Sequence, residues 1–110
     1  MTFDIQYVPS FGKDLKKLSK KYPSLKNDFA ELVRSLEKEP FQGVALGNSC
    51  RKIRLKISSK GKGKSGGARV ITYVVIKETI VYLLAIYDKS DRLTLSDKDI
   101  SKLLKRIDSN

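Results

Sequence analysis

Residues 50–76 read CRKIRLKISSKGKGKSGGARVITYVVI and hold two β-branched runs on either side of a basic, glycine-containing stretch. In the first run, apolar residues alternate with a basic ladder: Ile53, Leu55 and Ile57 against Lys52, Arg54 and Lys56. Alternation with period two predicts a strand, with its cations roughly 6.7 Å apart along one face. Such a face can follow a nucleic-acid backbone. The alternative is an ordinary half-exposed strand with a basic outer side.

The stretch between the two runs contains the GKS tail of a phosphate-binding loop, at Gly63, Lys64 and Ser65. The first glycine of that motif would fall at Ser58, and the next element is a strand rather than the helix that such a loop requires. We therefore interpret the stretch as a flexible basic connection. Its lysines are predicted to contact RNA phosphates: Lys60, Lys62 and Lys64.

The rest of the chain supplies helices and further strands around this pair. Residues 2–8 alternate with the period of a strand, whose inward side chains would be Phe3, Ile5 and Tyr7. Apolar residues at steps of four and three then predict two helices, over 10–21 and 23–38, which Pro23 separates. Residues 41–49 are predicted to be a loop, 79–87 a strand after a tight turn near 77–79, and 96–107 a helix capped by Ser96 with Asp99. The order is β-α-α-β-β-β-α.

The composition sets the class of protein. The chain has 110 residues, a length that suits a single domain over 1–110, and the predicted order of helices and strands makes it an α+β domain. Its net charge of +11 favours an acidic partner, with nucleic acid foremost. A basic n-region with an apolar h-region is absent from the start, and no apolar run approaches membrane-spanning length, so a cytoplasmic protein without a membrane partner is expected. Cys50 is the single cysteine and is expected to be inert.

The absence of histidine restricts acid–base chemistry on RNA to Lys, Arg, Tyr or carboxylates. A lysine among other cations has a lowered pKa and becomes available as a base, whereas arginine stays protonated and suits a phosphorane. Cations without a carboxylate cluster argue against a two-metal mechanism, so no metal and no small-molecule cofactor are expected.

Taken together, CRKIRLKIS, GGARVITYVV, IVYLLAIYDKSD and the helix opening F-x-KDLKKLSKKYPSL resemble the RelE/ParE superfamily of bacterial toxins. The K/G-rich loop before GGAR is similar to the HigB-like branch. The resemblance implies a RelE-like fold, in which an antiparallel sheet packs against an N-terminal helix hairpin, with a C-terminal helix. It also implies an mRNA interferase: a metal-independent endoribonuclease of a type II toxin-antitoxin system that cuts mRNA in the ribosomal A site by attack of the 2′-hydroxyl. Its partners would be the ribosome, mRNA and a cognate antitoxin.

Roles for individual residues follow from the same resemblance. Lys52 would take the hydroxyl proton, Arg69 would stabilise the transition state, and Lys89 or Arg54 would assist the leaving oxygen. The tyrosine that some RelE nucleases carry after the last strand has no match, and Leu95 stands about there. Tyr87, at the end of the last strand, either takes its place by stacking on a base or is a buried tyrosine at the end of the sheet. The remaining predicted RNA contacts are Arg51 and Lys56.

Two other functions stay open at the level of sequence. A ParE-like protein would inhibit DNA gyrase without ribonuclease chemistry. A non-catalytic RNA-binding module would use the charge for affinity alone, so that each lost cation weakens binding by a similar modest amount. The antitoxin would use an acidic, amphipathic segment, placed over the sheet or in place of the helix over 96–107.

Overall fold

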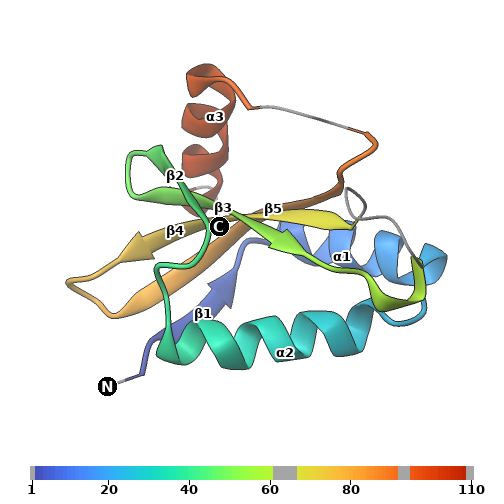
Figure 1. Cartoon of the computed structure of the whole chain (residues 1–110). Coiled ribbons are helices and arrows are strands. Elements are labelled where there is room, and N and C mark those ends of the chain that lie inside the picture. The colour runs from blue at the N-terminus through green and yellow to red at the C-terminus, as the bar shows by residue number, and fades with distance from the viewer. Residues whose placement is uncertain (1, 61–66, 92–94, 109–110) are drawn as a thin grey trace.

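The computed structural model describes residues 2–60, 67–91 and 95–108. It has the α+β architecture that the sequence predicts, with a mixed sheet and three helices (Figure 1). In chain order the elements are β1 (Asp4–Tyr7), α1 (Pro9–Lys21), α2 (Leu25–Lys38), β2 (Val44–Gly47), β3 (Cys50–Leu55), the 3₁₀ turn η1 (Ser58–Lys60), β4 (Ala68–Val75), β5 (Ile80–Asp88) and α3 (Asp97–Asp108).

The five strands lie in the order β1-β5-β4-β3-β2. The strands from β2 to β5 pair antiparallel, as predicted, whereas β1 joins the far side of β5 in parallel. A right-handed crossover through helices is how parallel neighbours are normally connected, and here α1 and α2 with the following antiparallel strands separate β1 from β5. The sheet is therefore mixed, and β4 lies at its centre.

Strand β2 corrects the prediction of a loop over residues 41–49. Gly43 and Gly47 mark this stretch as irregular, yet both glycines border or end a strand that pairs with β3. Asn48 and Ser49 have φ of 54° and 62°, the two consecutive positive values of a tight two-residue hairpin turn. The sheet consequently gains an edge strand beside the basic ladder.

The two predicted helices are present, with small changes at their starts. Pro9 occupies the first turn of α1, where its missing N–H costs nothing, and α2 begins at Leu25 rather than at Pro23. The apolar stripe faces the sheet, as expected of core: Phe11, Leu25, Leu32 and Leu36 are buried, and Leu15, Leu18, Tyr22 and Phe29 are partly buried against them.

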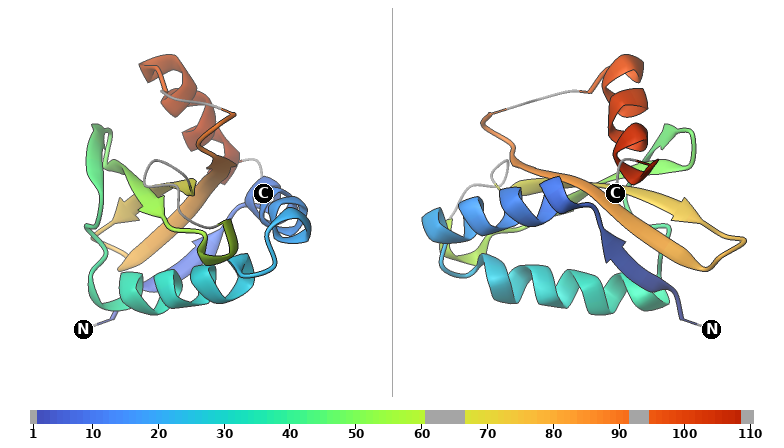
Figure 2. Two further views of the ribbon diagram at one scale, coloured as in Figure 1. Left: turned by 45° about the vertical axis from the view of Figure 1, so that its right-hand side comes forward. Right: turned by 180° about the vertical axis from the view of Figure 1, so that it is seen from behind.

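The helices cover the two faces of the sheet unequally. Helices α1 and α2 form one layer under the sheet, and α3 stands against the opposite face, where it packs on β5 (Figure 2). Ser96 and Asp99 form the predicted capping box, because each side chain bonds the other's backbone N–H at 3.1 and 3.0 Å. Ile100 and Leu103 are the buried residues of α3.

Strand β1 only partly follows its predicted burial. Phe3 and Ile5 are half-buried, but Tyr7 is 57 % exposed, because β1 is an edge strand and the Tyr7 ring lies over Phe11 at the rim of the core. Within the described parts of the chain, no helix combines the length and apolar character needed to cross a bilayer.

Candidate active site

The basic ladder lies on β3 with its side chains divided as predicted. Ile53 and Leu55 are buried on the side of α1 and α2, so Lys52 and Arg54 emerge on the opposite face of the sheet, the face on which α3 stands. Lys52 is half-buried and Arg54 is exposed. The strand alternation therefore delivers two cations to one face.

Arg69 adds a third cation from β4. It is the register partner of Arg54, and directly opposed residues of antiparallel strands share a face. Arg69 is only 6 % exposed, and its Nη1 donates to the backbone carbonyl of Ala68 at 3.1 Å. Among the described residues no carboxylate forms an ion pair with it. Two opposed guanidinium groups destabilise each other, and an anion placed between them would reverse that effect.

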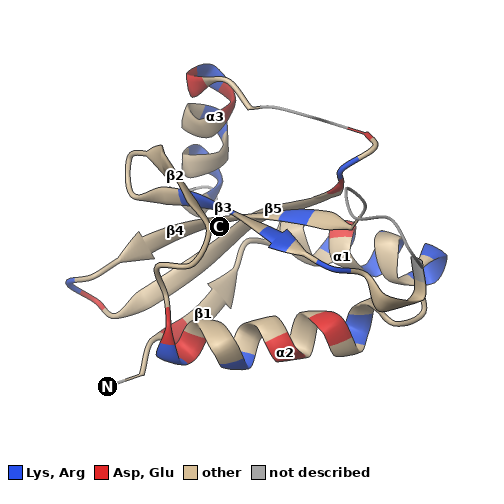
Figure 3. Cartoon of the chain, viewed as in Figure 1, with Lys and Arg blue, Asp and Glu red and all other residues tan. Residues whose placement is uncertain are grey.

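A cavity of about 440 Å³ opens on this face of the sheet. We call it the four-cation cavity, and its lining residues are Gly43, Val44, Lys52, Arg54, Arg69 and Lys89. Figure 3 shows the basic segments of β3 and of the start of β4 side by side. Four of the five residues predicted to act in catalysis thus line one cavity, although they come from separate parts of the sequence.

The end of β5 fixes Lys89 at the edge of this cavity. Its backbone N–H donates to the carbonyl of Gly67 at 3.1 Å, which joins the end of β5 to the start of β4. The preceding Asp88 is 1 % exposed, and its carboxylate accepts from Tyr22 Oη at 2.6 Å and from both N–H and hydroxyl of Ser90. This buried network connects the end of α1 to the turn that carries Lys89.

Tyr87 is the predicted catalytic residue that does not line the cavity. It is the register partner of Arg69, but its ring is half-buried and its hydroxyl oxygen is shielded from solvent. The role of Tyr87 in base stacking stays a prediction.

Comparison with known proteins shows which solved structures share this fold. No model of a known protein family matches the sequence. A variant of the E. coli toxin RelE in which two arginines are replaced by alanine, in the free state, matches 97 % of this chain and 99 % of its own, with a TM-score of 0.65 and 16 % identity. The chain has the RelE-like fold. The isolated E. coli RelE toxin matches at 22 % identity and a TM-score of 0.52, over 96 % of this chain and 98 % of its own. The toxin-antitoxin complex RelBE2 of Mycobacterium tuberculosis matches 80 % of this chain and 99 % of its own, at 16 % identity and a TM-score of 0.58.

Arg51 has a structural position in this RelE-like fold. Its guanidinium donates to the carbonyl of Gln42 at 3.0 Å and to that of Gly43 at 2.9 Å, so it braces the segment that leads into β2. We predicted an RNA contact for Arg51. These two hydrogen bonds give the side chain a role in holding one wall of the four-cation cavity, and the RNA contact stays a prediction.

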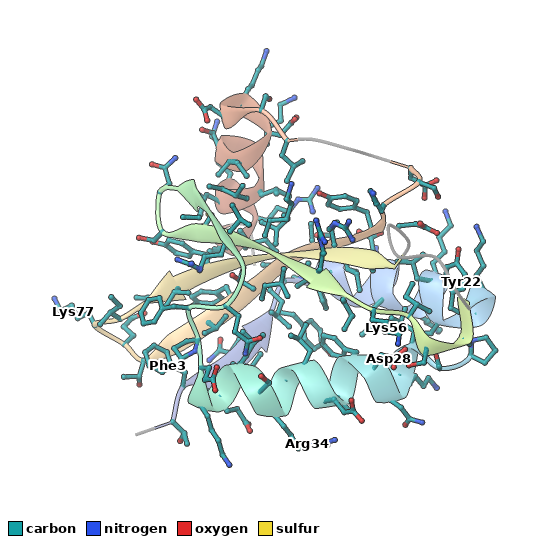
Figure 4. All side chains as sticks on the ribbon, viewed as in Figure 1. Phe3, Tyr22, Asp28, Arg34, Lys56 and Lys77 are labelled. Carbon is teal, nitrogen blue, oxygen red and sulfur yellow. The ribbon has the colours of Figure 1, made fainter. Side chains whose placement is uncertain are left out.

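Lys56 also lies apart from the cavity. It follows the end of β3 and lines a separate hollow of about 400 Å³ with Asp28, Glu31 and Ser58. Figure 4 shows Lys56 beside Asp28 of α2. The basic ladder therefore contributes Lys52 and Arg54 to the four-cation cavity, whereas its third cation, Lys56, lies near the carboxylates of Asp28 and Glu31.

The lysines of the basic connection fall outside the described residues: Lys62 and Lys64, together with the side chain of Lys60. The connection begins at η1, which a carboxylate holds against α2. Asp28 accepts from the N–H of Ser58 at 2.9 Å and from its hydroxyl at 2.7 Å, while Ser24 bonds Ser59. Partial burial raises the pKa of Asp28, but these hydrogen bonds, the one from Ser24 and the charge of Lys56 outweigh it and leave the pKa below its usual value.

Three residues of this region were missed by sequence reasoning. Asp28 clamps the start of the basic connection, and Gly43 with Val44 forms the uncharged wall of the cavity. Gly43 carries a usable signal, because an isolated glycine beside a strand often marks a close backbone approach. Asp28 has none, since its partners lie 30 residues away in the sequence.

Proposed function

We propose that this chain is the toxin of a type II toxin-antitoxin system and cleaves mRNA in the ribosomal A site. The observation that supports the proposal most strongly is the four-cation cavity, which gathers Lys52, Arg54, Arg69 and Lys89 around space for an anion. The RelE-like fold supports it further, because two of the matched proteins are bacterial toxins. A cavity with four cations repels a divalent metal, so the proposed reaction uses protein groups alone.

The proposed reaction is an intramolecular transesterification. The 2′-oxygen attacks the adjacent phosphorus as Lys52 removes its proton, and the bond from phosphorus to the 5′-oxygen breaks. Arg69 bonds the equatorial oxygens of the phosphorane, where charge develops. Lys89 gives the leaving 5′-oxygen its proton, with Arg54 holding the phosphate. The products are a 2′,3′-cyclic phosphate and a 5′-hydroxyl end, with no net change in protons.

The burial of Arg69 suits this assignment. A guanidinium that is 6 % exposed and bonded to a backbone carbonyl keeps a fixed orientation, so it needs little reorganisation as the reaction proceeds. Lys52 and Lys89 are each half-buried and line the cavity, so they are more accessible than Arg69. Fixed stabilisation and accessible proton transfer are thereby divided between different residues.

The proposed partners are the ribosome, mRNA and an antitoxin, which places the protein in the cytoplasm. The Mycobacterium tuberculosis match is a toxin-antitoxin complex. A variant of E. coli RelE with two arginines replaced by alanine, in complex with a peptide of the antitoxin RelB, matches 93 % of this chain and 94 % of its own, with 20 % identity and a TM-score of 0.50. The net charge of +11 favours an acidic antitoxin segment. We expect an acidic protein encoded beside this chain to co-purify with it. Expression of the chain alone should arrest growth, and co-expression of that acidic protein should relieve the arrest.

Primer extension in a reconstituted translation reaction tests the activity. We expect cuts at A-site codons when ribosomes, mRNA and the chain are combined, and none on the same mRNA without ribosomes. Cuts on free mRNA at the same rate would contradict ribosome dependence. Absence of cuts in both reactions would contradict the nuclease, and a DNA supercoiling assay would then test gyrase inhibition.

A further inference from the structure

The four-cation cavity has one apolar side chain in its lining, and that side chain is exposed. Val44 is 64 % exposed, although valine in a strand is usually covered. It is the register partner of Lys52, so both side chains lie on the face of the cavity. Exposed single apolar residues are common, but this one stands at the edge of an anion site.

The wall that carries Val44 is held firmly against β3. Gly43 has φ of +91°, and a Cβ atom there would lie 2.3 Å from the carbonyl oxygen of Lys52 and 2.9 Å from Ile53 Cγ1. The backbone of Gly43 therefore sits directly on the neighbouring strand, where no side chain fits. The two hydrogen bonds from Arg51 to Gln42 and Gly43 hold the same segment.

We propose that Val44 and Gly43 form a nucleobase subsite, on which the base of the bound nucleotide lies while its phosphate is held by the cations. The proposal deepens the proposed function and rests on it for the choice of an RNA nucleotide as the ligand. Inorganic phosphate needs only the cations. A nucleotide combines an anionic group with a flat face that has little need of hydrogen bonds, and an apolar wall beside a cationic floor fits both parts.

The dimensions and the neighbours agree with this ligand class. A volume of about 440 Å³ falls within the range of roughly 300–1,000 Å³ of small-molecule sites. Tyr87, the residue that sequence reasoning assigned to stacking, is half-buried beside Arg69 and is not part of the lining. An aliphatic side chain reads no hydrogen-bonding edge, so the subsite should prefer the larger purine face and otherwise tolerate any base.

Methyl NMR of the whole chain tests the subsite without requiring cleavage. The ligands are inorganic phosphate, ribose 5-phosphate, uridine monophosphate and adenosine monophosphate. All four should shift the backbone amides of Lys52, Arg54 and Arg69. The two nucleotides alone should shift the Val44 methyl groups upfield through the ring current of the base, more with adenosine than with uridine. The Ile76 methyl groups, 65 % exposed but in another hollow, should not move.

A matched pair of variants gives the second measurement. Val44→Thr exchanges one methyl group for a hydroxyl at an exposed position, so folding should be retained, and it should weaken adenosine monophosphate binding about fourfold without changing phosphate binding. Ile76→Thr should change neither affinity.

The outcomes separate the two proposals. If all four ligands shift the cation amides alike while the Val44 methyl groups stay in place, or if Val44→Thr binds the nucleotide as wild type does, the base subsite is overturned and the anion site stands. If no ligand shifts any of these signals, both the subsite and the proposed nuclease site are contradicted.

Discussion

Arg54 of β3 and Arg69 of β4 are register partners on adjacent strands, and both lie on the face of the sheet that carries the four-cation cavity. Arg69 is almost completely buried, and neither guanidinium has a carboxylate within ion-pair distance among the described residues. Like charges in directly opposed positions lower the stability of a sheet. The arrangement is readily explained if a phosphate normally occupies the space between them.

Removal of one charge from this pair should stabilise the protein without ligand. Arg54→Gln is expected to raise the free energy of unfolding in dilute chloride by about 0.2–1 kcal/mol, since Arg54 is exposed and only the repulsion is lost. Inorganic phosphate should raise the Tm of the wild type more than that of the variant. Thermal unfolding with and without phosphate measures both effects. Equal phosphate responses would show that the pair does not bind the anion.

The two neighbouring arginines of β3 should differ in their effect on RNA binding. Arg54→Gln should weaken binding to a short RNA and reduce the slope of log K against log salt by about one, because Arg54 lines the four-cation cavity. Arg51→Gln should leave that slope unchanged, because Arg51 bonds backbone carbonyls. Fluorescence anisotropy at several salt concentrations provides the measurement.

Arg51→Gln should instead be visible in stability. Loss of two hydrogen bonds from a charged donor is expected to cost about 1.5–3 kcal/mol, measured by urea denaturation. A reduced salt slope together with unchanged stability would return Arg51 to the RNA-contacting role that the sequence suggests.

The Asp28 clamp should make stability depend on pH. The folded-state pKa of Asp28 lies below its ordinary value of 3.8, so the carboxylate stabilises the fold above that value and loses this contribution as pH falls through the folded pKa. Asp28→Asn should therefore be less stable than wild type by about 1–2 kcal/mol near neutral pH. The gap should close below pH 3.8. Urea denaturation over a pH series measures it, and a gap that stays constant would contradict the clamp.

Cys50 should react slowly in the native state. Its side chain is 1 % exposed, and burial raises the pKa of the thiol to about 11. We expect alkylation by iodoacetamide at mildly alkaline pH to be far slower for the folded chain than for the chain in urea. Mass spectrometry of the modified fraction over time gives both rates. Similar rates would mean that the β2–β3 hairpin opens readily.

Local patterns of the sequence predict much of this fold. The apolar steps of α1 and α2, the alternation of β3 and the Ser96 and Asp99 cap are each set by residues close together in the chain, and each is found in the structure. The likeness of the strands and helices to RelE toxins then predicted their overall arrangement, which the structural matches confirm. The gathering of Lys52, Arg54, Arg69 and Lys89 at one cavity follows from that arrangement.

The features that escaped prediction depend on contacts between distant segments. β2 is an edge strand whose glycines are typical of loops, and only its pairing with β3 makes it a strand. Arg51 is one more cation of a basic run in the sequence, and its hydrogen bonds to the backbone carbonyls of Gln42 and Gly43 depend on how β3 packs beside the segment before β2. Lys56 likewise turns toward Asp28 because the regular strand ends at Leu55.

The most direct test of the proposed nuclease is to compare Arg69→Lys with wild type in the reconstituted translation reaction, measuring the single-turnover cleavage rate and ribosome association together. Lysine retains the charge but loses the planar pair of donors, so cleavage should fall by roughly 10²–10³-fold while association stays within a few-fold. Arg34→Lys, the same exchange on the exposed face of α2, should change neither quantity. Cleavage by Arg69→Lys at the wild-type rate, or a parallel loss of cleavage and association, would contradict a catalytic Arg69.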